Sequence, residues 1–229
     1  MDCINKSEVL HLPRDTFNSE LESLHHDIIR MGTRVGEQIT DSMTSLLNHD
    51  SDLADTVIKN DDIVDKMETS IEEKCVKLIA RQQPLAIDLR RIFASIKFAT
   101  DLERIADYAV DIARITVRLK GEEYIKPLID IPSMARIVRE MINSSIDAYI
   151  NRDIEMAERV CLMDDKVDAH YKQVFNDLLE LMKKDPSTIN QGAQFLLLSK
   201  FLERAGDHVT NICEWTVYLV TGEYKEMND

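Results

Sequence analysis

Acidic side chains recur at one-turn spacing in two stretches of the sequence that lie about 100 residues apart. A helix advances about 100° per residue, so acids four positions apart share one face. Carboxylates on a common face repel each other by a few tenths of a kcal/mol, so the pattern indicates either a solvated face or a bound cation. The acids concerned are Asp65, Glu103, Asp107 and Asp111 in the first stretch and Asp168, Glu203 and Asp207 in the second.

The chemistry open to these acids is metal binding by oxygen ligands. On a helical projection, Glu103, Asp107 and Asp111 border the face that carries the apolar residues, where neighbours can partly desolvate them. Oxygen-only sites suit hard or borderline cations such as magnesium, manganese or iron. The alternative is a set of solvated acidic faces, in which Arg104 and Arg204 neutralise their acidic neighbours. The recurrence in both stretches favours the metal interpretation.

An enzymatic alternative is a ferritin-like, carboxylate-bridged di-iron bundle. Glu22 and His25 form one ExxH pair, but such folds need two, and the sequence has this single candidate. His25 and His26 are interpreted as a surface pair. The sequence contains no HExxH, P-loop, dinucleotide-binding or nucleophile-elbow motif. We therefore expect a protein that is not an enzyme.

An internal repeat places these acids on equivalent elements. Asp61-Asp62-Ile63-Val64-Asp65 returns as Asp164-Asp165-Lys166-Val167-Asp168, at an offset of 103 residues. Leu102-Glu103-Arg104 returns as Leu202-Glu203-Arg204, at an offset of 100 residues. Two tandem copies, expected at residues 15–124 and 133–225, explain both the length of the chain and the drift of the offset.

Each copy has the apolar periodicity of three helices. In the first copy we expect a helix from about residue 21 to 46, a second from 51 to 81 and a third from 84 to 120. In the second copy we expect helices near 133–151, 153–184 and 187–221, with Ser133 as an N-cap. Gly32 and Gly36 match GxxxG, but their surroundings are too polar for a membrane dimer face, so we interpret the match as coincidental. The predicted fold is all-α, with two tandem three-helix bundles.

Composition narrows the class of protein further. Only 6 Gly and 5 Pro occur in 229 residues, which favours long helices over tight turns. The 28 Lys and Arg against 42 Asp and Glu leave a net charge of −14, which opposes binding to nucleic acid or anionic membranes. No apolar run approaches 18 residues, no secretory signal is evident, and the 4 Cys are scattered. We expect a cytoplasmic protein with reduced, buried thiols at Cys75, Cys161 and Cys213.

The doubled motif resembles the PhoU family of phosphate-signalling proteins. The segments that carry the resemblance are Arg81–Arg90, Asp101–Ala109 and Leu202–Ile212, and the resemblance extends over roughly residues 15 to 225. The second copy departs from the pattern at Ser187–Gly192 and Ser199–Phe201, so the two copies need not bind ligands equally.

The resemblance implies a non-enzymatic, cytoplasmic negative regulator of phosphate uptake and phosphate signalling. It implies contact with the ATPase subunit of the high-affinity phosphate ABC transporter and with the phosphate sensor histidine kinase, so that membrane association is peripheral and through these partners. It also implies iron or zinc on the E/DxxxD motifs, here Glu103 with Asp107 and Glu203 with Asp207. A homodimer is compatible with the adaptor, with the di-iron enzyme and with a purely structural bundle.

Overall fold

The computed structural model describes residues 13–82 and 84–227, and every regular element in those ranges is helical. Met1 to Lys6, in which no secretory signal is evident, lie outside the described residues. The first copy contains α1 (Pro13–Leu47), α2 (Ser51–Lys59), α3 (Asp61–Gln82) and α4 (Ala86–Arg118). The second contains α5 (Asp130–Asn151), α6 (Ile154–Lys184), the 3-10 turn η1 (Pro186–Thr188) and α7 (Ile189–Thr221). The all-α prediction is confirmed.

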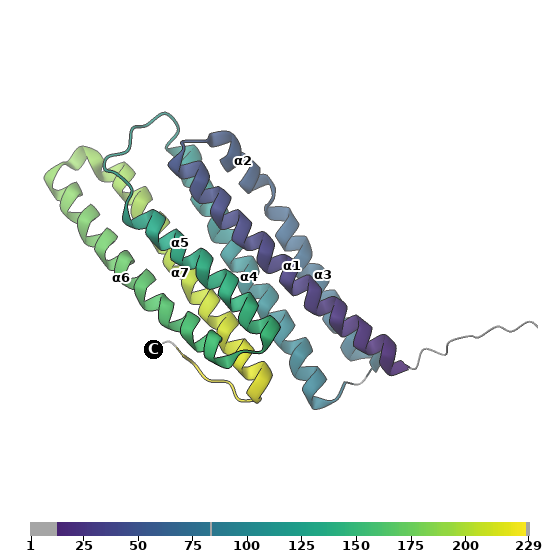
Figure 1. Ribbon diagram of the computed structural model, residues 1–229. Coiled ribbons are helices and arrows are strands. Elements are labelled where there is room, and N and C mark those ends of the chain that lie inside the picture. The colour runs from purple at the N-terminus through teal and green to yellow at the C-terminus, as the bar shows by residue number, and fades with distance from the viewer. Residues whose placement is uncertain (1–12, 83, 228–229) are drawn as a thin grey trace, which may run out of the picture.

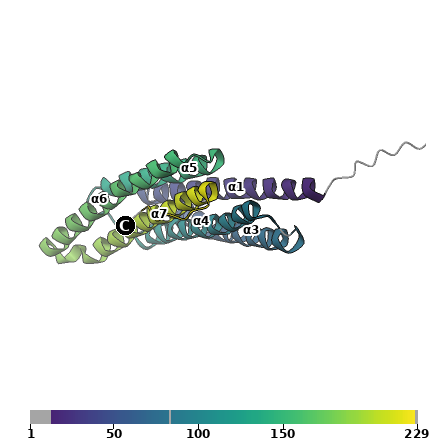
Figure 2. The ribbon, with the colours of Figure 1, turned by 90° about the horizontal axis from the view of Figure 1, so that it is seen from below.

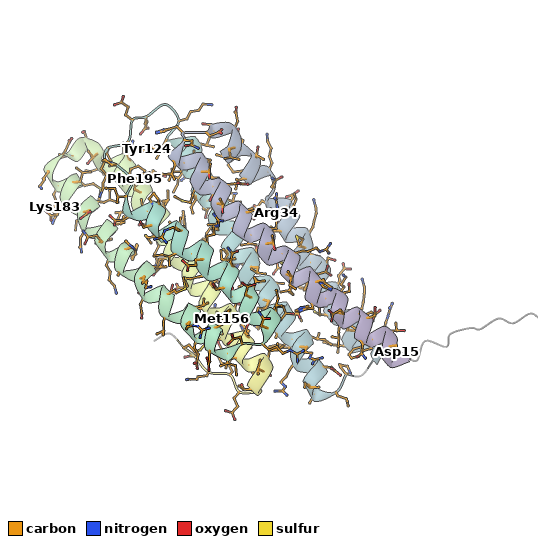
Figure 3. The ribbon with its side chains drawn as sticks, in the orientation of Figure 1. Asp15, Arg34, Tyr124, Met156, Lys183 and Phe195 are labelled. Atoms are coloured by element: carbon orange, nitrogen blue, oxygen red, sulfur yellow. The ribbon has the colours of Figure 1, made fainter. Side chains whose placement is uncertain are left out.

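The third helices of the two copies, α4 and α7, pack side by side along the middle of the molecule (Figure 1). The view from below shows α1 and α5 on one side of this pair (Figure 2). On the outer flanks, α3 packs against α4 and α6 packs against α7. One continuous apolar core runs through both copies, and its largest fully buried side chains include Phe98 and Phe195. The copies are therefore fused through a common core, whose side chains fill the space between the ribbons (Figure 3).

The repeat is visible in the backbone where the first helix of each copy ends. His49 and Arg152 occupy equivalent positions, and both adopt the left-handed conformation with φ of 53°. The next residue in each copy, Asp50 or Asp153, then caps the following helix by accepting a backbone hydrogen bond with its side chain. The same pair of conformations, a left-handed residue followed by an N-cap aspartate, turns the chain into the second helix of each copy.

Three predicted helix boundaries are wrong. The first helix, expected from about residue 21, already begins at Pro13. The helix expected over 51–81 is broken at Asn60, where α2 ends and α3 begins, because asparagine competes for backbone hydrogen bonds and favours helix ends. The equivalent residue in the second copy is Met163, and α6 runs through it. Ser133 is not an N-cap: α5 already begins at Asp130, and the Ser133 hydroxyl donates to the Ile129 carbonyl oxygen at 3.2 Å.

The GxxxG match is not a membrane dimer face, as interpreted, but one of its two glycines makes a tight helix contact within the chain that the sequence analysis did not foresee. Gly32 and Gly36 of α1 lie against α5, and the missing side chain of Gly32 lets the two helices approach closely. A Cβ atom on Gly32 would lie 2.5 Å from Ile146 Cδ1, whereas one on Gly36 would lie 3.6 Å from its nearest neighbour, Asn143 Oδ1. Gly32 thus marks the tighter contact between the copies.

This difference predicts opposite outcomes for two alanine substitutions on one helix. Gly36→Ala should stabilise the protein by up to about 1 kcal/mol, since alanine is the better helix former and its methyl group fits. Gly32→Ala should bring no gain and a net loss of about 1 kcal/mol, because Ile146 must move within a packed interface. Urea unfolding of the two variants measures this difference. Equal stability of both would show that Ile146 relaxes freely.

Candidate functional site

The first acidic face lies between α3 and α4. Its centre is Glu103, whose side chain is only 16% exposed and whose pKa is raised to about 7. Burial is the largest cause, followed by the negative charge of Asp107, while Arg104 opposes the shift. Glu68 and Asp65 on α3 raise the pKa of Glu103 further, so acids from the two helices face one another. Asp65, Glu103 and Asp107, predicted as ligands, are therefore brought together.

Asp61, which the sequence places one turn before Asp65 but which is not among the predicted ligands, belongs to the same face. Its Oδ1 atom is buried, and no hydrogen bond reaches that atom within the described ranges of the chain. Burial, then Asp65, then Asp107 raise the pKa of Asp61. A buried carboxylate oxygen without a donor, beside two further carboxylates, is the environment that a cation would stabilise.

Arginines neutralise part of this face, as the alternative interpretation expects. Arg104 lies 3.0 Å from Asp107 and 3.4 Å from Glu103, measured between nitrogen and oxygen. Asp111 pairs instead with Arg114 at 2.8 Å, and its side chain is 35% exposed. Asp111 is therefore the predicted ligand with a dedicated cationic partner, while Asp107, at 40%, is the most exposed of the three on α4.

The second acidic face lies between α6 and α7 and differs in charge. Burial, then Glu203, raise the pKa of Asp207, and Asp168 of α6 acts in the same direction. Lys200 opposes this shift and forms an ion pair with Glu203, which is 13% exposed. The face thus has a lysine in contact with its most buried glutamate, and a cation bound there would compete with that lysine.

Gly206 of α7 lets the buried carboxylate of Asp164 approach the helix, since a Cβ atom there would overlap Asp164 Oδ1. The first copy has Ala106 at the equivalent position.

We expect Gly206→Ala to destabilise the protein by about 1–2 kcal/mol despite the better helix propensity of alanine, because the Asp164 carboxylate, which is 5% exposed, must move. Gly206→Ala should cost the same free energy of unfolding when it is combined with Asp164→Asn, since asparagine has the same shape as aspartate. Urea unfolding of the single and double variants tests it, and a stabilised Gly206→Ala would contradict the expectation.

The carboxylates of the two acidic faces have the oxygen ligands and the negative charge that a hard cation prefers. Both faces offer carboxylate oxygens on facing helices, and on the first face one buried oxygen has no hydrogen-bond donor. Across residues 13–82 and 84–227, no three His, Cys, Asp or Glu side chains converge as closely as the ligands of a bound ion. The carboxylates would have to turn toward the ion when it binds.

The ExxH pair does not join either acidic face. The pKa of His25 is lowered, first by burial, and the charges that act on it are those of Glu22, His26 and Arg152. His25 lies against Tyr149, with 4.9 Å between ring centroids, and His26 lies 3.5 Å from Glu22. The carboxylate–histidine cluster that the di-iron alternative requires is thus not formed among the described residues.

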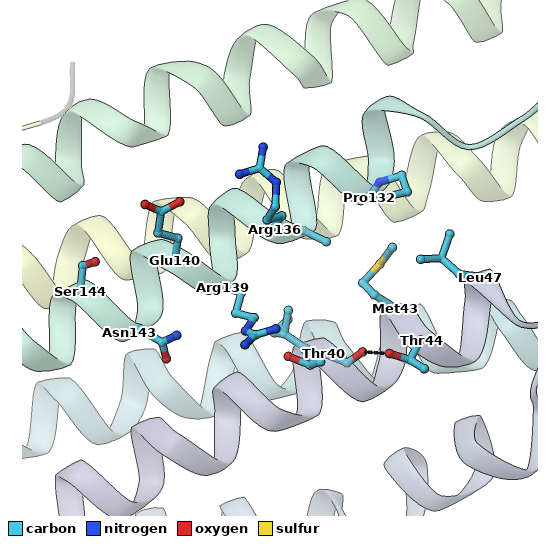
Figure 4. Close-up of a pocket in the computed structure, with 12 residues that line it drawn as sticks. Thr40, Met43, Thr44, Leu47, Pro132, Arg136, Arg139, Glu140, Asn143 and Ser144 are labelled. Carbon is cyan, nitrogen blue, oxygen red and sulfur yellow. Dashed lines mark hydrogen bonds between the residues drawn. The ribbon is translucent and has the colours of Figure 1, made fainter.

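A hollow between α1 and α5 was not foreseen from the sequence, since it forms where two distant helices diverge beyond the Gly32 contact. Its volume is about 520 Å³, with Ile39, Met43 and Ala135 among its lining residues. Arg139 reaches across it toward Thr40, while Arg136 points away toward α6 (Figure 4). With two arginines and one acid, Glu140, on its walls, this hollow is not a metal site.

Within the described part of the chain, no helix combines the length and the apolar character needed to cross a bilayer. The thiols of Cys75, Cys161 and Cys213 are free and buried, as predicted.

Comparison with known proteins identifies the family. The family model of the PhoU domain matches twice, over residues 28–116 and 131–216. A phosphate-specific transport system accessory protein PhoU homolog of Clostridium acetobutylicum is 47% identical over 219 residues, covering 95% of this chain and 100% of the relative. The accessory protein PhoU of Escherichia coli is 37% identical, covering 90% and 86%.

Solved structures agree with these relatives. The crystal structure of PhoU from Pseudomonas aeruginosa superposes with a TM-score of 0.87 at 36% identity, covering 90% of this chain and 100% of that one. That of the regulatory protein PhoU from Streptococcus pneumoniae gives 0.85 at 28% identity, covering 91% and 99%. These relatives have the names of accessory and regulatory proteins, in agreement with the expectation of a protein without enzymatic activity. By sequence and by fold, the chain belongs to the PhoU family.

Proposed function

We propose that this protein is a cytoplasmic accessory protein of a phosphate-specific transport system that represses phosphate uptake and phosphate signalling when phosphate is plentiful. The observation that carries the proposal is the 47% identity to a PhoU homolog over 95% of the chain, joined to the same fold. Deletion of the gene should raise phosphate uptake and transcription from phosphate-starvation promoters in phosphate-rich medium, and the wild-type chain should restore both. Unchanged uptake and transcription after deletion would contradict the proposal.

The partners in this proposal are the ATPase subunit of the phosphate ABC transporter and the phosphate sensor histidine kinase, with membrane association through them alone. The names of the relatives support the link to a transport system. Affinity capture from phosphate-replete cells should retain both partners, and capture from starved cells should retain less. Recovery of neither protein from replete cells would remove the adaptor role. Sedimentation of the purified chain tests the proposed homodimer separately.

Metal binding on the acidic faces is the second part of the proposal. Asp65, Glu103 and Asp107, with Asp61 added and Asp111 at the edge, would hold iron, zinc, manganese or magnesium on the first face. Asp168, Glu203 and Asp207 would do so on the second. A bound ion supplies positive charge that offsets repulsion between facing carboxylates. The first face has the unpartnered Asp61 oxygen and lacks a lysine equivalent to Lys200, so we expect it to bind the ion more tightly.

Metal content of the purified protein tests this expectation. Glu103→Gln with Asp107→Asn should remove the tighter site, and Glu203→Gln with Asp207→Asn the weaker one, after each cation is loaded and excess is dialysed away. Asp62→Asn is the matched control, because Asp62 is an exposed α3 acid paired with Lys66. Equal metal content in all variants, or melting temperatures that neither chelator nor cation changes, would leave the faces as solvated acids.

A further inference from the structure

A small polar pocket lies where the two copies meet, apart from both acidic faces. Its volume is about 260 Å³, and its walls come from α1, α4, α5 and the turn after α5, with one residue from α7. It is smaller and more polar than the hollow between α1 and α5. The lining residues that could bind a ligand are Glu22, His25, Arg91, Ser95, Tyr149 and Arg152.

The cationic side chains of this pocket come from different copies. Arg91 belongs to the first copy, on α4, and Arg152 belongs to the second, at the turn that follows α5. Both positive charges act on the Tyr149 hydroxyl, and Arg152 acts also on the His25 ring. The two guanidinium groups therefore belong to one pocket, which they share with the Tyr149 hydroxyl.

The pocket also contains buried hydrogen-bonding groups. Tyr149 is 6% exposed and Ser95 is 4% exposed, and their hydroxyls interact. The Ser95 hydroxyl is in turn 2.9 Å from the Arg91 carbonyl oxygen, to which it donates. The free donors that a compact anion can accept are thus the two guanidinium groups, and the two buried hydroxyls lie beside them in the same small space.

The charge balance in the pocket is opposite to that of the chain as a whole. No carboxylate among the described residues forms an ion pair with Arg152, and Arg91 has only a long contact, 3.7 Å, with Asp88. Glu22, the one acid lining the pocket, lies 3.5 Å from His26. In a protein with a net charge of −14, two arginines with so little compensation leave a local positive charge that an anion entering the pocket from solvent can offset.

We propose that this pocket binds a small oxyanion of the size of phosphate between Arg91 of the first copy and Arg152 of the second. Guanidinium groups bind phosphate and carboxylate oxygens in pairs of parallel hydrogen bonds, which suits a compact anion bridging two arginines. At roughly 30 Å³ per water, the pocket has room for such an anion with several waters. The bound anion would tie the two copies together at a point where their cationic side chains otherwise repel.

The site stands independently of the proposed function, but the two connect if the anion is inorganic phosphate. In that case the adaptor would sense phosphate directly, a step that rests on the proposed function. Binding to purified protein and repression in cells are separate measurements, so one can fail while the other holds.

Calorimetric titration of the purified full chain tests the site. Inorganic phosphate, sulfate and acetate are titrated at constant ionic strength with a chelator present, so that metal on the acidic faces cannot contribute. We expect saturable binding of phosphate at one site. Sulfate binding of similar strength would identify a general dianion site, and acetate binding alone would identify a carboxylate site. Either result would support the oxyanion proposal and would exclude direct sensing of phosphate.

Four variants distinguish this site from binding elsewhere. Arg91→Gln and Arg152→Asn should each weaken binding at least about tenfold, the loss expected when one charge-assisted contact is removed. Asparagine is chosen at 152 because it tolerates the positive φ of 53°. Glu22→Gln should tighten binding severalfold, since it removes the acid of the pocket. Arg81→Gln, at an exposed α3 position, should change nothing.

The proposal is overturned if none of the three anions binds, or if binding survives both arginine substitutions unchanged. Urea unfolding of each variant shows whether a loss of binding reflects the fold. Because Glu22→Gln is expected to gain affinity, its result does not depend on damage to the structure.

Discussion

Glu103→Gln should make the metal-free protein more stable than the wild type above pH 7, by about 1–2 kcal/mol. Glu103 has its pKa raised from 4.5 to about 7, so folding favours the protonated carboxyl group. The wild type therefore loses stability as pH rises from about 4.5 to 7, where the folded state binds more protons than the unfolded state. A difference of one in pKa corresponds to about 1.36 kcal/mol of stability. We expect a smaller effect than this conversion gives, because solvent partly screens the Glu103 charge. Glutamine keeps the shape and removes the charge.

Urea unfolding of both proteins from pH 5 to pH 8, with chelator present, measures this difference. It should grow between pH 5 and 7 and level off above pH 7. The control is Glu73→Gln on α3, because Lys77 lowers the pKa of Glu73 and the substitution should have the opposite sign. A difference that stays constant with pH would show that the Glu103 carboxylate is not destabilised in the fold. A saturating divalent cation should stabilise the wild type more than Glu103→Gln if the proposed first metal site forms.

Phe98→Ala should lower the free energy of unfolding by about 3–5 kcal/mol, the range measured for removing a buried aromatic ring from a core. Phe98 on α4 is fully buried, and its ring centroid lies 4.7 Å from that of Tyr149 on α5. The ring thus fills the core between the two copies. Because domains are stable by only about 5–15 kcal/mol, this variant should unfold at much lower urea concentration.

Phe93→Ala is the matched control, one and a half turns earlier on the same helix. Phe93 is 43% exposed and meets Trp215 edge-to-face at 5.7 Å, so its loss should cost only about 1 kcal/mol. Both variants are compared by urea unfolding at one pH. Similar losses would mean that the boundary between the copies tolerates a cavity, in conflict with the continuous core.

The helices themselves were predictable because their signals are local. Apolar periodicity located all six predicted helices, and the repeat explained why the elements recur. The errors fall where one side chain decides a boundary. Asn60 interrupts a pattern that remains amphipathic on both sides, and its carbonyl oxygen accepts from Gln38 at 3.4 Å, a partner on another helix. Ser133 has the right residue type for a cap, but Asp130 starts the helix one turn earlier.

The acidic faces were predictable in part. Helical spacing correctly put Glu103 and Asp107 on one face, and equivalence between copies pointed to Glu203 and Asp207. That α3 lies opposite, so that Asp61 and Asp65 act on the same cluster, depends on how α3 packs on α4. Spacing within one helix contains no information about that packing.

The sequence by itself determined the helical class, the duplication, the family and the residue types that could hold a cation, since each of these is encoded in local spacing or in a motif. The tertiary structure decided which charges remain uncompensated. Lys200 reaches Glu203, Arg114 reaches Asp111, and Arg152 reaches no carboxylate in the described residues. Electrostatic energies depend on distance and burial between helices, so the lysine contact on the second face and the cationic pocket at the junction emerge only once the copies are packed together.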